Sequence, residues 1–134
     1  MAETVVFCNG AFDCLHVGHL RFLEFSRQQG SSLVVAVNSD ESIARRKGQF
    51  RPVVTLQERC EILLALCCVD RVVEFDDDPL VPIKSIVPQV YVVGCDYDDE
   101  CPASKFVKER GGIVVRYTIR HQSTSDIVKR FRCS

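Results

Sequence analysis

Two histidines three residues apart are the residues in this sequence best suited to chemistry. His16 and His19 follow a short β-branched run and lie, with Gly10 and Gly18, where an amphipathic segment begins. In a helix this spacing puts both imidazoles on one face, beside backbone N–H groups that have no partner inside the helix. Such a helix start attracts anions, Gly10 allows the backbone to approach a ligand closely, and Gly18 leaves room between the rings. The stretch therefore predicts a phosphate-binding site.

The histidines lie between two elements of an α/β unit. A run of apolar and β-branched residues at 4–8 indicates a strand, and the spacing at 20–29 indicates a helix. The loop between such elements is where an open α/β sheet usually binds its ligand. Neither G-x-G-x-x-G nor G-x-x-x-x-G-K-[ST] occurs in the sequence, which argues against a dinucleotide-binding domain and a P-loop protein.

Cationic residues in the second quarter of the chain are further candidates for anion contacts. A basic, turn-prone loop contains Lys47 and Arg51, and beside a phosphate site it is more than a solvated loop. Arg59 is expected in the first turn of the next helix, where a cation opposes the helix dipole. A substrate phosphate would account for it, and so would an ion pair with Glu58 or Asp40.

Two more loops are expected at the edge that carries the histidines. Gly94, Asp96 and Tyr97 follow an apolar run, and Asp96 could accept hydrogen bonds from a nucleoside or cap a turn. The hydroxyl cluster at 123–125 starts the last helix, and its Ser123 has capping-box spacing to Asp126. The cluster has two explanations, a helix cap and a grip on a triphosphate.

Length and composition bound the class of protein. The sequence has 134 residues, 46% of them hydrophobic, which predicts one soluble domain spanning 1–134. A net charge of −1 argues against binding a nucleic acid polymer. Since no basic leader or apolar run of about 20 residues occurs, we expect no membrane association and a cytoplasmic location.

Eight cysteines raise the question of metal or redox chemistry. None forms a C-x-x-C pair, and most lie among valines and leucines in expected strands or helices, so reduced thiols are predicted. A cysteine-based metal or redox module remains the alternative. The residues themselves predict no metal site.

Strands and helices are expected to alternate along the chain, which predicts an α/β fold with a parallel sheet. The expected strands are 4–8, 33–37, 69–75, 89–93 and 113–117. The expected helices are 20–29, 39–45, 55 to about 67, 76–88, 102–110 and one that starts at Ser123.

The run from Gly10 to His19, read as G-x-F-D-x-x-H-x-G-H, resembles the signature of the cytidylyltransferase-like nucleotidyltransferases, and the resemblance covers nearly the whole chain. Runs such as 37–40 and 94–97 are most similar to heptose 1-phosphate adenylyltransferases, and glycerol-3-phosphate cytidylyltransferases come next. The resemblance implies a single Rossmann-like, doubly wound domain with a five-stranded parallel sheet and helices on both faces. It also implies a homodimer.

The implied reaction moves a nucleoside monophosphate from a nucleoside triphosphate to a small phosphorylated sugar or polyol and releases pyrophosphate, with Mg²⁺ as cofactor. The favoured substrates are ATP and D-glycero-D-manno-heptose 1-phosphate, giving ADP-heptose. CTP and glycerol 3-phosphate, giving CDP-glycerol, are the alternative. A non-catalytic nucleotide-binding regulatory protein is a third hypothesis, because Thr118 and His121 stand where glycerol and choline enzymes carry Arg and Gly; Arg116 or Arg120 could substitute for that Arg.

The resemblance also implies roles for individual residues. The expected catalytic residues are His16, His19 and Lys47. The expected nucleotide-binding residues are Gly10, Ala11, Phe12, His16, Gly18, His19, Gly94, Asp96, Tyr97, Ser123, Thr124 and Ser125. The expected acceptor-binding residues are Asp13, Lys47, Arg51 and Arg59.

Overall fold

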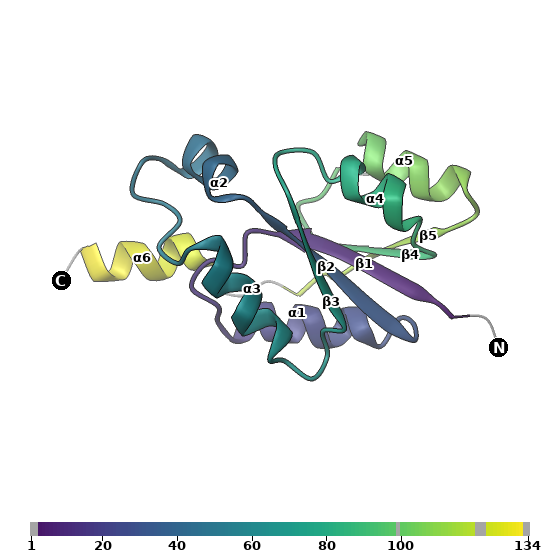
Figure 1. Cartoon of the computed structure of the whole chain (residues 1–134), viewed down its shortest axis with the longest axis horizontal. Coiled ribbons are helices and arrows are strands. Elements are labelled where there is room, and N and C mark those ends of the chain that lie inside the picture. Colours follow the sequence, from purple (N-terminus) through teal and green to yellow (C-terminus); the bar gives the residue numbers. More distant parts are fainter. Residues whose placement is uncertain (1–2, 99, 120–122, 133–134) are drawn as a thin grey trace.

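Five parallel strands form the centre of the molecule (Figure 1). The computed structural model describes residues 3–98, 100–119 and 123–132. The strands are β1 (Val5–Gly10), β2 (Ser32–Asn38), β3 (Arg71–Phe75), β4 (Val90–Val93) and β5 (Ile113–Arg116). They pair in the order β3-β2-β1-β4-β5, so the parallel α/β sheet expected from the sequence is confirmed.

Helices cover both faces of this sheet, as expected. The helices are α1 (Val17–Arg27), α2 (Asp40–Lys47), α3 (Leu56–Leu64), α4 (Leu80–Ile86), α5 (Pro102–Glu109) and α6 (Thr124–Arg132). Successive side chains of a strand point to opposite faces. Cys8 accordingly packs in one core cluster with Leu23 of α1 and Leu63 of α3. Phe7 packs in the other with Ile83 of α4 and Val107 of α5.

The strand order reverses between β1 and β4. From β1 the chain proceeds to β2 and β3 on one side, and it then returns to place β4 on the other side of β1. The loops after these two strands therefore diverge and leave a crevice at the carboxyl edge, where open α/β sheets bind ligands. The helices α2 and α6 lie toward this edge (Figure 1).

Element ends differ from the expectations in ways that have local causes. The strand β1 continues to Gly10, because Gly10 still pairs with Val37 of β2. The helix α3 ends at Leu64 rather than near residue 67. There the backbone tightens, with the Leu66 N–H bonding the Leu63 carbonyl, and the chain then turns into β3.

No helix within the described part of the chain is long and apolar enough to cross a membrane. The seven cysteines in the same part of the chain are free thiols.

Candidate active site

The two histidines build the start of α1 between them. His16 is the N-cap residue, and its Nδ1 accepts a hydrogen bond from the Gly18 N–H at 3.1 Å. In return, the His16 N–H donates to Nδ1 of His19 at 3.2 Å. This is a capping box in which imidazoles take the places usually held by Ser or Thr and by Glu or Gln. The rings stack with centroids 3.9 Å apart, so the helix start fixes both side chains.

These hydrogen bonds also fix the position of the ring protons. Because Nδ1 of each ring accepts a backbone N–H, the ring proton is on Nε2, which becomes the donor. Burial, with a smaller contribution from His16, lowers the pKa of His19 from 6.5 to about 4, although Asp13 raises it in part. His19 is therefore a neutral N–H donor at physiological pH.

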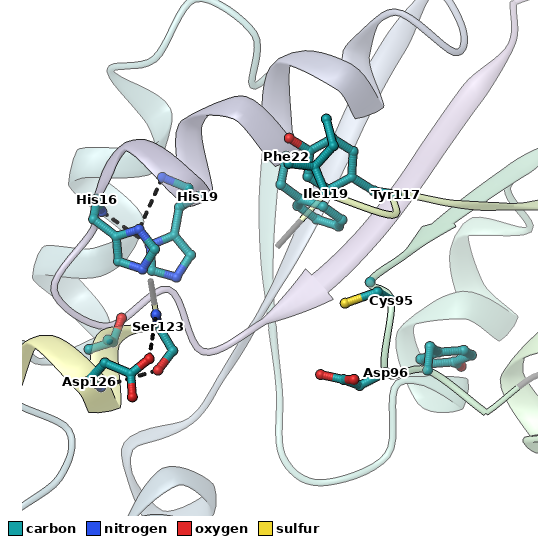
Figure 2. Close-up of a pocket in the computed structure, with 13 residues that line it drawn as sticks. His16, His19, Phe22, Cys95, Asp96, Tyr117, Ile119, Ser123 and Asp126 are labelled. Carbon is teal, nitrogen blue, oxygen red and sulfur yellow. Dashed lines mark hydrogen bonds between the residues drawn. The ribbon is translucent and has the colours of Figure 1, made fainter. Parts of the chain in front are cut away.

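A pocket of about 720 Å³ opens beside the stacked rings (Figure 2). Figure 2 shows Ser123 and Asp126 next to the rings, and Asp96, Cys95 and Tyr117 farther across the pocket. Its lining comprises His16, Gly18, His19, Phe22, Gly94, Cys95, Asp96, Tyr97, Tyr117, Ile119, Ser123, Thr124 and Asp126. The imidazoles and the start of the last helix thus face one cavity, as a shared polyphosphate site requires.

Short polar contacts attach the start of α6 to the rest of the site. The Thr124 hydroxyl donates to the backbone carbonyl of Asp13 in the loop after β1. Ser123 and Asp126 form the expected capping box, with the Asp126 N–H donating to the Ser123 hydroxyl at 3.1 Å and the Ser123 N–H donating back at 3.2 Å. The hydroxyl cluster at 123–125 therefore caps the helix, which is one of the two roles expected for it. It also lines the pocket.

A smaller pocket of about 310 Å³ adjoins the first. The two pockets share His19, Phe22, Gly94, Ser123 and Thr124. The smaller one is also lined by Asn9, Gly10, Ala11, Phe12, Asp13, Lys47, Arg51 and Ser125. Lys47 and Arg51 bring positive charge to it, and Arg51 donates to the Ser125 hydroxyl at 3.3 Å. Two connected spaces beside His19 could hold two anions at once.

The loop after β4 is held in place from β5. Arg116 donates to the carbonyls of Cys95 and Tyr97, both at 2.9 Å. The Tyr97 hydroxyl bonds the Cys101 thiol, and its ring packs edge-on against Tyr91. Arg116 thus holds this loop, and its suggested replacement of an arginine near the hydroxyl cluster stays a prediction, while Arg120 and His121 lie outside the described residues.

Comparison with known proteins decides the family. The family model described as cytidylyltransferase-like matches residues 7–130. The chain belongs to the cytidylyltransferase-like family. It is 46% identical over 131 residues to the bifunctional protein HldE of Syntrophotalea carbinolica and 48% identical over 133 residues to that of Alcanivorax borkumensis. These alignments cover 96% and 97% of this chain but only 27% and 28% of the relatives, so the chain spans about a quarter of their length.

Solved structures agree with this family assignment. A lipopolysaccharide core biosynthesis protein from Thermoplasma volcanium superposes with a TM-score of 0.76 at 27% identity, covering 90% of this chain and 100% of that one. A pantothenate synthetase from Thermus thermophilus, with a TM-score of 0.58 at 19% identity over 89% of this chain and 57% of that one, shares the fold. The chain thus has the fold of a solved structure that covers 90% of it, in agreement with its cytidylyltransferase-like family model.

Asp13 of the cytidylyltransferase-like signature faces the protein rather than a ligand. Its carboxylate accepts the N–H groups of Val53 and Val54 and the Nε–H of Arg51, each at 2.9 Å. Burial raises the pKa of this carboxyl, but the three donors more than offset burial, and the pKa lies below its ordinary value. With its side chain 0% exposed, Asp13 positions the loop that carries Arg51, and the expected contact with the acceptor stays a prediction.

Arg59 likewise lies beneath the site and not in it. Its side chain is 0% exposed and bonds the carboxylate of Asp40 at 2.7 Å. The other donors bond the carbonyls of Ala11 and Asn38 at 2.8 Å and that of Val54 at 3.0 Å. The ion pair with Asp40, which was the expected alternative, is therefore present and gives Arg59 a structural role, while acceptor binding by Arg59 stays a prediction.

Several pocket residues were not foreseen. Phe22 lies three residues after His19 on α1, so helical spacing alone could have identified it. Asn9 precedes the glycine of the signature and lines the smaller pocket, but in the sequence it reads only as a strand end. Tyr117 and Ile119 line the larger pocket because β5 ends beside β4, which spacing does not reveal.

The lowered pKa of His19 predicts a pH dependence of stability in this cytidylyltransferase-like domain. With a folded pKa of about 4 against an ordinary 6.5, the unfolded chain binds more protons between those values, so stability is complete above pH 6.5 and decreases as the pH falls toward 4. We expect the free energy of unfolding to drop by about 2 kcal/mol from this group between pH 7.5 and pH 5. Urea unfolding at both pH values measures it.

A His19→Gln variant is the control for this pH effect, because glutamine does not titrate. Its stability should decrease less than that of the parent over the same interval. Equal decreases in the two proteins would show that the pKa of His19 is not lowered by folding.

Proposed function

We propose that the chain transfers an adenylyl group from ATP to a heptose 1-phosphate, giving ADP-heptose and pyrophosphate. The observation that carries the proposal is the convergence of two imidazoles and the start of α6 on one pocket that continues into a second, cation-lined pocket. The larger pocket suits a nucleoside triphosphate, and the smaller one suits the phosphate of an acceptor. His19 borders both, so it lies where the two anions would meet.

These residues would promote the reaction mainly by electrostatic stabilisation. An oxygen of the acceptor phosphate attacks the α-phosphorus in line, forming one P–O bond as the bond to the leaving pyrophosphate breaks. Since an anion attacks an anionic centre, the protein must align the two groups and neutralise charge. The Nε2–H groups of His16 and His19 donate to the triphosphate, while Lys47 and Arg51 hold the acceptor phosphate.

The far side of the larger pocket suits the nucleoside. Asp96 and Tyr97 stand in the loop that Arg116 holds, and Tyr117 and Ile119 add apolar surface. An aromatic and aliphatic wall with a carboxylate beside it matches a base and a ribose. These contacts support nucleoside binding, and the resemblance to heptose 1-phosphate adenylyltransferases favours adenine.

Three similarities support a heptose 1-phosphate as acceptor. The motifs around 37–40 and 94–97 resemble heptose 1-phosphate adenylyltransferases, two curated relatives are named HldE, and a structural neighbour is a lipopolysaccharide core biosynthesis protein. A homodimer and a cytoplasmic location belong to the same proposal. Sedimentation at micromolar concentration tests the dimer.

The proposal includes Mg²⁺ as the cation that binds the phosphates of the nucleoside triphosphate. Within residues 3–98, 100–119 and 123–132, no three His, Cys, Asp or Glu side chains gather in a way that could hold a metal ion. Mg²⁺ normally keeps several waters and binds through substrate phosphates with one or two carboxylates. Asp96 and Asp126, which line the larger pocket, are the carboxylates that could assist, and the ion would neutralise charge on the phosphates.

Pyrophosphate release tests the function directly. ATP and CTP are each combined with heptose 1-phosphate and with glycerol 3-phosphate, and we expect turnover with ATP and heptose 1-phosphate. Turnover only with CTP and glycerol 3-phosphate would establish the alternative substrates. Nucleotide binding by calorimetry without product from any of the four pairs would overturn the enzymatic proposal and favour a regulatory protein.

A further inference from the structure

Asn9 stands where three pockets meet and has no part in the mechanism above. It lies near the carboxyl end of β1, paired in register with Ala36 of β2. Its side chain lines the small cation-lined pocket, a third pocket toward α2, and a fourth near the start of α5. A polar side chain at such a junction can contact whatever extends from one pocket into the next.

A buried tyrosine fixes the orientation of the Asn9 amide. Tyr91 of β4 is 0% exposed, and its ring packs edge-on against Phe7 and Tyr97. The Tyr91 hydroxyl donates to Oδ1 of Asn9. An amide whose oxygen accepts from one side presents its NH₂ group on the other. Tyr91 therefore turns the Nδ2 donor of Asn9 away from the core.

The third pocket is large enough for the sugar of a phosphorylated acceptor, and it is cationic where the phosphate would lie. It measures about 530 Å³ and is lined by Asn9, Gly10, Ala11, Asn38, Ile43, Arg46 and Lys47. It shares Asn9, Gly10, Ala11 and Lys47 with the small pocket, so the two adjoin. A ligand whose phosphate lies at Lys47 can extend its remaining atoms past Asn9 and under α2.

We propose that Asn9 is a specificity-determining residue, whose Nδ2 donates to a hydroxyl of the acceptor sugar in this third pocket, and that Tyr91 positions it. The proposal rests on the proposed function, because it needs an acceptor phosphate at Lys47. The ligand it specifies is a polyhydroxylated sugar phosphate of about hexose or heptose size, since a three-carbon polyol held at Lys47 would leave most of the pocket empty.

Removing the donor tests the role of Asn9. The Asn9→Ala variant should raise the KM for the sugar phosphate roughly tenfold, as loss of one buried hydrogen bond does, while the KM for ATP stays unchanged. Calorimetric titration of the sugar phosphate into protein preloaded with a non-hydrolysable ATP analogue measures the same loss without turnover. An acceptor KM within twofold of the parent would overturn the proposal.

A double-mutant cycle tests the role of Tyr91. Tyr91→Phe removes only the hydroxyl, and it should raise the KM for the acceptor by itself but add nothing in the Asn9→Ala background. Ser26→Ala is the matched control, because it removes another buried hydroxyl and Ser26 lines none of the four pockets. Additive effects of the two substitutions on the acceptor KM would show that Tyr91 does not act through Asn9.

The outcomes separate this inference from the proposed function. If the parent protein turns over a sugar phosphate and Asn9→Ala binds it equally well, only the role of Asn9 fails. If the parent turns over glycerol 3-phosphate and rejects the sugar phosphate, the third pocket is not a sugar site. If the parent neither turns over nor binds any phosphorylated acceptor, both proposals fail together.

Discussion

Replacing His19 by alanine is expected to lower kcat by about 10²- to 10³-fold, the usual cost of losing one fixed donor to transition-state charge. His19 borders both pockets, and its Nδ1 is held by the His16 N–H, so its Nε2–H faces the place where the two substrates would meet. The fixed donor needs no rearrangement during the reaction. Single-turnover kinetics with ATP and heptose 1-phosphate measure the effect.

Two controls separate this chemical role from a structural one. His19→Gln keeps an amide donor and should recover part of the lost rate, whereas the alanine variant also loses the hydrogen bond from the His16 N–H, at about 1 kcal/mol of stability. Because the pKa of His19 is about 4, the parent rate should not rise on acidification from pH 8 to pH 6 through this residue. A kcat for His19→Ala within threefold of the parent would remove its assigned role.

Replacing Arg59 by methionine should destabilise the fold by about 3–5 kcal/mol, because each buried carbonyl that loses its donor costs about 1–3 kcal/mol. The guanidinium joins the loop after β1, the end of β2, the start of α2 and the segment before α3, through Ala11, Asn38, Asp40 and Val54. Methionine fills much of the volume but leaves three carbonyls without this donor. Urea unfolding followed by far-UV circular dichroism measures the change.

Arg45 offers a matched comparison for Arg59. It forms ion pairs with Asp76 and Asp77 at the surface, and Arg45→Met should destabilise the fold far less than Arg59→Met, because solvent screens these pairs. Similar losses for both variants would contradict the buried, bridging role of Arg59. Arg59→Lys should not restore stability, since one ammonium group does not reproduce the planar fork of donors.

Local patterns sufficed to predict the order of the elements and the loop that places the two histidines beside a pocket. The apolar runs at 33–37 and 89–93 correspond to β2 and β4, and the Thr55 and Ser123 capping patterns start α3 and α6. Each of these signals depends on side chains within a few residues of one another. The end of α3 was less well predicted, because no glycine or proline follows Leu64 to stop the helix.

Roles that depend on burial were harder to predict. The sequence shows that Arg59 needs partners that accept hydrogen bonds. A substrate phosphate would meet that need, and so would the Asp40 carboxylate together with three backbone carbonyls. Asp13 posed the same problem, because its partners Val53 and Val54 lie 40 residues or more along the chain. Only the tertiary structure shows that these two charged residues hold loops in place, while Lys47 lines the pocket.

The attachment of α6 has a consequence for how the site is completed. All five strands of the described chain lie before residue 117, whereas a wall that both pockets share comes from Thr124, whose hydroxyl donates to the Asp13 carbonyl. A chain cut short at Ile119 would keep every strand and lose that wall. During synthesis the sheet can therefore assemble before the two pockets are complete, because their shared wall needs the α6 segment.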